Sequence, residues 1–209
     1  MSSERPRNRR EIQAEATRRD IVAAARKLFA ERGYGATTVA EIARAARVSP
    51  QTIYDSVGSK ARIIALLNDL VDAEAGVGEL AAGLATADDA FAVMRIQVQI
   101  PLRILHRCGD IVRAATQAGA TDPELAAVRR EGQRRHASGC ERVAARLEQM
   151  HALRIPLNDA VLTLTALTDV VWWAMLEDDY GWNPPRIAEW VEDSLKRLLF
   201  AVPDAAPGT

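Results

Sequence analysis

Apolar residues recur at helical spacing along most of the chain, and the first such pattern lies near the N-terminus. One apolar face is formed there by Ile21, Ala25, Leu28 and Phe29. Their i, i+4, i+7 and i+8 spacing is typical of an amphipathic helix. Thr17, with Asp20 at the third helical position, predicts the N-cap of this helix, and Gly33 and Gly35 predict its end. Residues 1–10 lack this period and indicate a flexible basic arm.

Three further helices follow closely. The segment Thr38–Glu41 predicts a capping box that opens a short helix ending near Ala46. Ser49 predicts the cap of the next helix, with Pro50 at its first position, where a missing N–H costs nothing. The chain then turns, and Ser59 starts a longer helix.

The remaining chain also has helical periodicity, and no segment alternates as a β-strand does. Residues 76–86 predict a connection of small residues. Four more helices are predicted, from 88 to at least 106 and at 122–150, 158–177 and 184–202. Pro101 predicts a kink in the first of them, and Asn183 with Pro184 predicts the cap of the last. The pattern as a whole predicts an all-α protein.

Composition agrees with a compact helical protein and excludes several classes. Of the 209 residues, 48% are hydrophobic and 26% are charged, which is typical of a globular chain rather than a disordered one. No apolar run reaches the roughly 18 residues that a membrane span requires, and no signal-peptide pattern follows the basic N-terminus. We therefore expect a cytoplasmic protein with no membrane partner.

Charge divides the chain into two parts. Residues 1–62 hold 13 Lys and Arg against 7 Asp and Glu, whereas residues 63–209 hold 14 against 21. A basic N-terminal part on an acidic remainder predicts that only the N-terminal part meets a polyanion such as DNA. The alternative is chance clustering, because short termini are often basic.

Residues 38–60 have the pattern of a helix-turn-helix, two short helices joined by a tight turn. Its inward positions are Val39, Ile42, Ala43, Ile53 and Val57. The outward positions of its second helix are Pro50, Gln51, Thr52, Asp55 and Ser56. Short polar side chains near a helix N-terminus can read base edges in the major groove. Tyr54 and Lys60 are placed for phosphate contacts, which fix register rather than sequence.

This segment resembles a known family. Residues 17–67 are similar to the DNA-binding domain of the tetracycline-repressor-like (TetR) family of bacterial transcriptional regulators. The similarity is carried by Leu28-Phe29, Gly33-Tyr34, Thr38-Val39, Ile42-Ala43, Val48-Ser49, Thr52-Ile53-Tyr54 and Ser59-Lys60. It implies a three-helix helix-turn-helix domain joined by a linking helix to a C-terminal helical domain for ligand binding and dimerisation. The helical pattern of residues 88–202 is similar to that regulatory domain.

The resemblance also implies roles for single residues. The residues expected at phosphates or bases are Thr38, Ser49, Gln51, Thr52, Tyr54 and Lys60. Arg47 stands where the family's turn usually has glycine, which either strains the turn or adds a phosphate contact. Val57 replaces a larger aromatic anchor, and Ala61-Arg62 replaces acidic residues.

Each of these DNA-contact roles has an alternative in which the residue has only a structural role. Tyr54 is otherwise a partly buried core residue, and Thr38 is a helix cap with or without a phosphate contact. Three arginines of the arm either enter a minor groove or only keep the chain soluble; they are Arg7, Arg9 and Arg10.

The family resemblance implies a small, largely apolar effector. The candidate contacts are Met94, Gln97, Trp172 and Trp173. Gln97 interrupts an apolar helix sector, where a polar group can orient such a ligand. The alternatives are a buried glutamine with a protein partner and plain core positions for the others. Glu177-Asp178-Asp179 either attract a cation or form a solvated helix end.

Two apolar stripes near the C-terminus predict either an intramolecular core or a dimer interface. The first consists of Val161, Leu164, Thr165, Thr168, Val171, Trp172 and Met175. The second consists of Ile187, Val191, Ser194, Leu195 and Leu198, with Trp190 beside it. In the resembled family the last two helices of each protomer form a four-helix interface, and a two-fold dimer fits a palindromic operator.

Metal, redox and enzyme chemistry have weak support. His136 and Cys140 lie at i, i+4, and His106 lies close to Cys108, but no spacing for four zinc ligands is visible. A Cys108–Cys140 redox switch is less expected than two buried thiols. There is no Gly-rich phosphate loop, HExxH or nucleophile–base pair, so we expect neither an enzyme nor a cofactor.

These patterns predict a DNA-binding transcriptional regulator with four segments. They are a flexible arm at 1–14, a helix-turn-helix domain at 15–62, a helical regulatory domain at 63–202 and a disordered tail at 203–209. We expect a homodimer that represses transcription from a palindromic double-stranded DNA operator and is released by a small-molecule effector. A regulator without such a trigger, an activator and a helical interaction adaptor are the alternatives.

Overall fold

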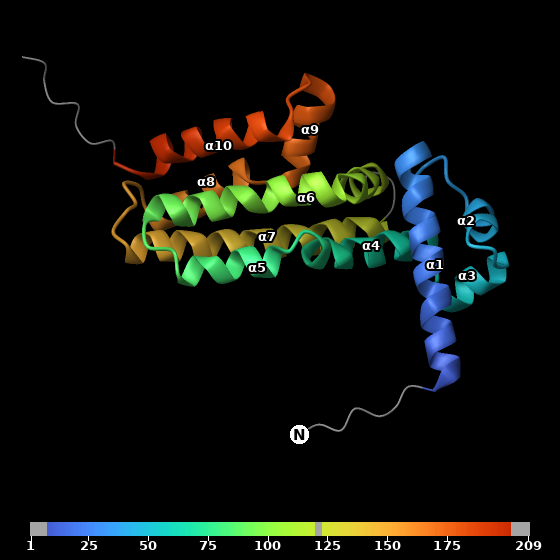
Figure 1. Ribbon diagram of the computed structural model, residues 1–209. Coiled ribbons are helices and arrows are strands. Elements are labelled where there is room, and N and C mark those ends of the chain that lie inside the picture. Colours follow the sequence, from blue (N-terminus) through green and yellow to red (C-terminus); the bar gives the residue numbers. More distant parts are fainter. Residues whose placement is uncertain (1–7, 120–122, 202–209) are drawn as a thin grey trace, which may run out of the picture.

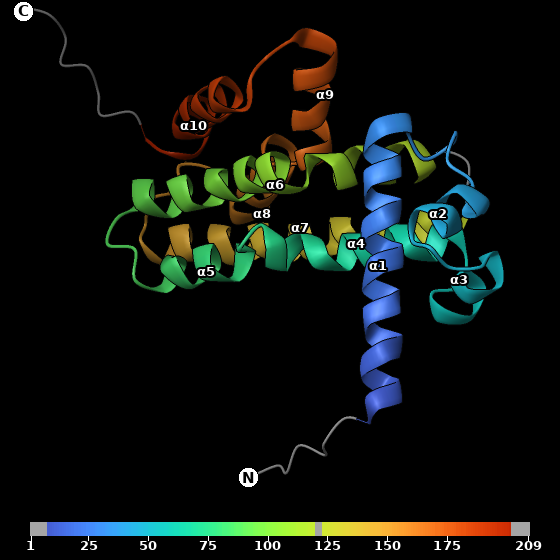
Figure 2. The same ribbon diagram turned by 45° about the vertical axis from the view of Figure 1, so that its right-hand side comes forward.

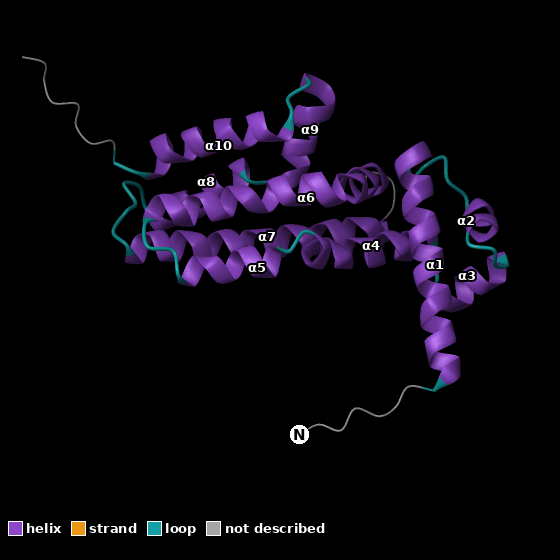
Figure 3. Cartoon of the chain, viewed as in Figure 1, coloured by secondary structure: helices purple, strands orange, loops and turns teal. Residues whose placement is uncertain are grey.

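The computed structural model describes residues 8–119 and 123–201, and within them the chain is helical without a strand (Figures 1 and 3). The elements are α1 (Arg9–Arg32), α2 (Val39–Ala45), α3 (Pro50–Ser56), α4 (Lys60–Glu74), α5 (Val77–Ala82), the 3₁₀ helix η1 (Gly83–Ala85), α6 (Ala90–Gly119), α7 (Pro123–Gln149), α8 (Leu157–Leu167), α9 (Val170–Tyr180) and α10 (Pro184–Leu199). We call α1–α3 the head and α4–α10 the body. The predicted all-α fold is confirmed.

The head consists of α1, with α2 and α3 lying against it on one side (Figure 1). Its first helix begins at Arg9 rather than near Thr17, so the predicted Thr17 cap is wrong. The start is set by Asn8, whose side chain caps the helix, together with Glu11, whose carboxylate accepts from the Asn8 backbone N–H at 2.9 Å. Residues 9–14 of the predicted flexible arm are therefore helical, whereas Arg7 lies outside the described residues.

The body is built around two long helices, α6 and α7, with α4 and α5 on one side and α8–α10 on the other (Figures 1 and 2). The dihedral angles of α6 leave the helical region at Cys108 (φ −134°, ψ 16°), so the break falls after the predicted kink site, Pro101. Before the break α6 packs into the apolar cluster of the body. After it, Ile111 and Ala118 pack into the cluster that holds the head's core.

Two other sequence expectations are corrected by the body. Residues 77–85 are helical, as α5 and η1, although small residues there predicted a plain connection. The single helix predicted at 158–177 is two helices, because the chain breaks at Thr168 and Asp169 caps α9 by accepting from Val171 N–H at 2.8 Å. The predicted cap of α10 is confirmed, since Asn183 Oδ1 accepts from Arg186 N–H at 2.9 Å.

Three arginines bind the head and the helices of the body together. Arg26 of α1 donates to both carboxylate oxygens of Asp110, at 2.6 and 2.9 Å, and to Glu74 at 2.7 Å. Arg135 of α7 reaches Asp72 of α4. The third, Arg113 of α6, pairs with Glu177 and Asp178 of α9, so two members of that acidic run form ion pairs within the chain.

No single described helix is long and apolar enough to cross a membrane. One bent pair, Leu157–Leu167 with Val170–Tyr180, meets the length and composition criteria only when its two helices are taken together.

Candidate nucleic-acid interface

The second helix of the motif, α3, is set by the cap that the sequence predicts. Ser49 Oγ accepts from Thr52 N–H at 3.0 Å, and Pro50 occupies the first position. The hydroxyls of Ser49 and Thr52 also lie 2.8 Å apart. Beneath them Ile53 is fully buried and Val57 nearly so, so α3 is seated on the head's core even though Val57 is smaller than an aromatic anchor. Both hydroxyls lie at the helix N-terminus, where a base edge or phosphate can approach.

The outer face of α3 carries polar and aromatic side chains. Tyr54 is 55% exposed, so its ring lies outside the core. Gln51 is exposed, and its Nε2 donates to Asp55 Oδ1 at 2.8 Å, one turn later on the same face. This hydrogen bond holds the glutamine amide in one orientation, with its carbonyl oxygen still able to accept.

Thr38 lies at the N-terminus of α2 and is engaged in a reciprocal cap. Its Oγ1 accepts from Glu41 N–H at 3.2 Å and donates to Glu41 Oε2 at 2.8 Å. Hydrogen bonds from the backbone and hydroxyl of Thr38 lower the pKa of Glu41, which also pairs with Arg32. The cap is thus observed, while the phosphate contact of the exposed Thr38 stays a prediction.

Lys60 has an intramolecular role that the sequence does not reveal. Its Nζ donates to the carbonyl oxygens of Tyr34 and Thr37, both at 2.9 Å, and lies 4.0 Å from the centroid of the Tyr34 ring. Partial burial lowers its pKa. An ammonium has three N–H donors, so at most one remains for DNA. The lysine therefore fixes the loop between α1 and α2, and its phosphate contact stays a prediction.

Arg47 occupies the turn between α2 and α3 in a left-handed conformation, with φ at +57°. Its side chain is exposed. The turn requires this conformation because Val48 N–H bonds back to Ala43 O at 2.9 Å, which reverses the chain after α2. A side chain with a Cβ is strained there, and this explains why the resembled family prefers glycine.

We expect Arg47→Gly to raise stability and weaken DNA binding together. Removing Cβ relieves about 1 kcal/mol of left-handed strain, although the added freedom of the unfolded chain offsets part of it. Thermal unfolding should shift upward by about 2 °C. Losing one phosphate contact should lower the log–log salt slope of DNA binding by about one. An unchanged slope would show that Arg47 does not touch DNA.

The four candidate ligand contacts of the body pack into its core to different degrees. Met94 and Trp173 are fully buried, and Trp173 Nε1 donates to Leu167 O at 2.8 Å. Trp172 is partly buried, with its ring 5.9 Å from that of Trp190. Gln97 is 3% exposed and donates to Thr168 Oγ1 at 3.0 Å. Gln97 is thus a buried glutamine hydrogen-bonded to a protein group, Thr168, which is the alternative to a ligand contact given above.

Gln97 belongs to a buried polar cluster that joins α6, α7 and α8. Its Nε2 also lies 3.4 Å from Cys140 Sγ, which lies 3.7 Å from His136 Nε2. Burial lowers the pKa of His136, but its contacts with Cys140 and with Thr165 O, 3.1 Å away, more than offset this and raise it. Sequence analysis did not predict Thr168 as the partner of Gln97. Thr168 was assigned to an apolar stripe, and nothing near it in the sequence indicated that its hydroxyl would accept a hydrogen bond.

Neither cysteine forms a disulfide, and the two thiols lie in different apolar clusters, Cys108 with the head's core and Cys140 in the body. Burial and the neighbouring Glu74 charge raise the pKa of Cys108 to about 11, which leaves it protonated at neutral pH. Among the described residues, no group of three or more His, Cys, Asp or Glu is placed to hold a metal ion.

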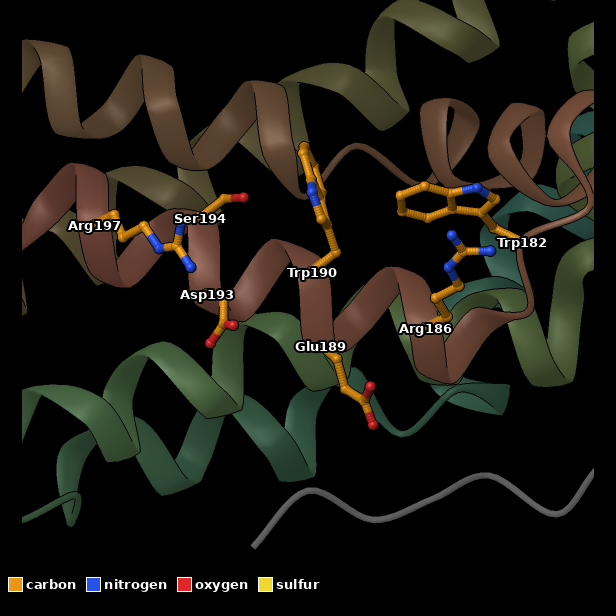
Figure 4. Close-up of a pocket in the computed structure, with 7 residues that line it drawn as sticks. All are labelled: Trp182, Arg186, Glu189, Trp190, Asp193, Ser194 and Arg197. Carbon is orange, nitrogen blue, oxygen red and sulfur yellow. The ribbon is translucent and has the colours of Figure 1, made fainter.

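The outer surface of α8–α10 is rich in exposed apolar side chains. They are Leu162, Val171, Met175, Trp190 and Leu198, all at least 38% exposed. An open pocket of about 390 Å³ lies along α10, where Arg186 lies 4.1 Å from the centroid of the Trp182 ring and Trp190 lies beside that ring, with 6.0 Å between the two ring centroids (Figure 4). Of the predicted C-terminal stripe, Ile187, Val191 and Leu195 are buried in the body, so these three form intramolecular core.

Comparison with known proteins supports the assignment of the head. Residues 21–67 match the family model of bacterial regulatory proteins, tetR family. A curated relative, the HTH-type transcriptional regulator HbdR of Aromatoleum sp. (strain CIB), is 46% identical over 59 residues, which are 28% of this chain and 26% of the relative. The match therefore spans about a quarter of that relative's length.

Solved structures extend the likeness over the fold of the body. NalD, the secondary repressor of the MexAB-OprM multidrug efflux pump in Pseudomonas aeruginosa, has a TM-score of 0.70 at 23% identity, with 90% of this chain and 98% of that chain covered. A SmeT–triclosan complex has a TM-score of 0.68 at 19% identity, with 93% and 96% covered. The family model matches most of the head and the start of α4, the curated relative is an HTH-type regulator, and the solved structures share the fold of most of the chain; we conclude that residues 21–67 are a DNA-binding segment of the tetR family of bacterial regulatory proteins.

Proposed function

We propose that the protein is a one-component repressor that binds a palindromic operator as a homodimer and releases it when a small, largely apolar effector binds the body. The observation that carries this is α3, a capped helix with a buried apolar underside and an exposed polar face, within a tetR-family head. Such a regulator acts on DNA in the cytoplasm.

In this proposal α3 enters the major groove. Gln51, Ser49 and Thr52 meet base edges or phosphates at its N-terminal end. The backbone contacts come from Thr38, Arg47, Tyr54 and Lys60. Backbone contacts set orientation and supply the salt dependence, whereas base contacts set sequence preference.

The homodimer would use the exposed apolar face of α8–α10. Singly scattered apolar side chains are normal on a protein surface, but here Val171 and Met175 lie one turn apart on α9, and Trp190 and Leu198 are both exposed on α10. A two-fold axis through this face would place two copies of α3 for the two half-sites of a palindrome.

An effector in the body has to separate side chains that now touch. Met94, Gln97 and Trp173 are buried against their neighbours. A ligand among them would therefore push α6 away from α8 and break the Gln97–Thr168 hydrogen bond. It would shift the protein only if it bound the parted state more tightly. That the related SmeT was solved with triclosan supports a drug-sized apolar ligand for this fold.

The proposal is tested by selecting random duplex DNA with the purified protein and reading the stoichiometry by native mass spectrometry. The expected result is a palindrome bound by one or two dimers. Enrichment of no sequence over non-specific DNA would overturn the proposed operator binding.

Two substitutions should separate positioning from readout. Tyr54→Phe removes one hydroxyl from an exposed ring, and we expect about a three- to tenfold loss of affinity on every sequence alike. Gln51→Ala should instead flatten the preference at one base position. Competition binding against single-base operator variants measures both, and an equal loss on all sequences for Gln51→Ala would contradict its base contact. Lys60 is a poorer choice because its removal would also free the loop after α1.

A further inference from the structure

A groove between α1 and α4 has no role in the function proposed above. Figure 2 shows α1 crossing the body, with its N-terminal half projecting beyond the helices of the body. The groove has a volume of about 270 Å³ and lies where the two helices meet. Val22 of α1 and Leu66 and Leu70 of α4 contribute its apolar lining, and Leu70 is 43% exposed. An apolar floor open to solvent favours a ligand with an apolar part.

The charges of the groove favour an anion. Arg26 and Glu74 also line it, but they pair with each other, and Arg26 pairs with Asp110 as well. Arg18 and Arg19 lie in the lining without an ion pair among residues 8–119 and 123–201. One further lining acid, Glu15, leaves a surplus of one positive charge among the groups not already paired.

We propose that this groove binds a small amphipathic anion, an apolar chain or ring that carries one carboxylate. The apolar part would lie on Val22, Leu66 and Leu70, and the carboxylate would accept hydrogen bonds from Arg18 or Arg19. A ligand of roughly a dozen non-hydrogen atoms suits the volume. The site differs from the body contacts around Gln97, because its lining comes from α1 and α4 alone.

Occupation of the groove would oppose DNA binding. The anion would neutralise part of the head's positive charge, and its apolar part would press between α1 and α4, the helix that follows the head. Both effects act where the head meets α4 rather than through the body contacts around Gln97. This regulatory consequence rests on the proposed function, whereas the binding itself does not.

The binding is tested by calorimetric titration of the full-length protein, without DNA, with two probes that share a ten-carbon chain. The probes are decanoate and the decyltrimethylammonium cation. We expect one decanoate per chain and at least tenfold weaker binding of the cation, because a charge-assisted contact contributes about a factor of ten. Equal binding of the two probes, or no decanoate binding, would overturn the proposal.

Paired variants locate the site. Arg18→Gln/Arg19→Gln should weaken decanoate binding about tenfold, whereas Arg9→Gln/Arg10→Gln on the same helix should not change it. Leu70→Asp places a carboxylate on the groove floor and should also weaken binding, with Ile12→Asp, at a 55% exposed position outside the groove, as its control. Decanoate binding that survives both groove variants, or is lost equally in the controls, would overturn the proposal.

The regulatory consequence has its own readout. Decanoate should lower the affinity of the wild-type protein for the selected operator and have at least several-fold less effect on Arg18→Gln/Arg19→Gln. A protein that binds decanoate in the groove but selects no operator would refute the proposed function and leave the site standing. A protein that binds its operator but not decanoate would refute the proposed groove site and leave the proposed function standing.

Discussion

In the proposed homodimer, Trp190→Glu should separate the two protomers and weaken binding to the proposed operator by at least a hundredfold. Trp190 is 43% exposed and lies at the centre of an aromatic group, 5.9 Å from the ring of Trp172 and 6.0 Å from that of Trp182. A few central residues carry most of the binding energy of an interface, at about 2 kcal/mol or more each, and tryptophan is enriched among them. A buried carboxylate without a partner adds a desolvation cost. Once the dimer is lost, each head binds alone, and the gain from linking two sites, about 10²- to 10⁴-fold, is lost with it.

The measurement is sedimentation equilibrium together with operator titration. Trp190→Phe keeps an apolar ring and should remain dimeric, and Ile12→Glu tests a new carboxylate at an exposed apolar position far from this face. A Trp190→Glu protein that remains dimeric and folded would place the interface elsewhere.

Arg26→Met should cost about 2 kcal/mol and lower the melting temperature by about 4–8 °C. The side chain is 27% exposed and binds Asp110, Glu74 and the Arg107 carbonyl, so the substitution leaves two carboxylates and one carbonyl without this donor. Partial exposure keeps the loss below that of a fully buried pair. The adjacent Lys27→Met is the matched control, because Lys27 is 77% exposed and its pair with Glu31 spans 3.9 Å; it should change stability by less than about 0.5 kcal/mol. Equal effects of the two substitutions would contradict a structural role for the Arg26 contacts.

The same contacts predict an acid dependence. Burial alone would raise the pKa of Asp110, but the hydrogen bonds and charge of Arg26 more than offset it and lower the pKa. The carboxylate therefore stabilises the fold at neutral pH, and this contribution is lost as the pH falls from about 4 through the lowered pKa. Urea unfolding at a series of pH values should show that Asp110→Asn is less stable than wild type at pH 7. The difference should narrow below about pH 4, and a constant difference would argue against the ion pair.

Local signals in the sequence predicted most helix starts correctly. Ser49-Pro50, Thr38 with Glu41, and Asn183-Pro184 each begin a helix, because a cap depends only on residues within one turn. The Asn8–Glu11 capping box is equally local, but it was not predicted because the residues around it show no apolar periodicity. The break at Cys108 was missed for a different reason. It coincides with the Arg107 carbonyl accepting from Arg26, a partner 81 residues away that no local pattern shows.

The residues of the candidate site could be predicted from the sequence, but their hydrogen-bond partners within the protein could not. Exposure of Gln51 follows from helical spacing, which places it opposite Ile53, whereas Tyr54 lies only about 100° from Ile53 and its exposure was not fixed by spacing. The carbonyl contacts of Lys60 depend on how the loop between α1 and α2 folds over it, and the Gln97–Thr168 contact joins residues 71 positions apart. Such distant pairs are decided by tertiary packing.

The two ends of α6 belong to different apolar clusters, and this limits how the molecule can be divided. Cys108, Ile111, Ala114 and Ala118, together with Leu125 of α7, complete the core around Ile21 and Ile63. A fragment cut after α4 would lack these side chains and expose the apolar surface they cover. Modular exchange of DNA specificity among relatives, by nature or by chimera construction, would therefore have to carry this part of α6 along or substitute only the outer face of α3.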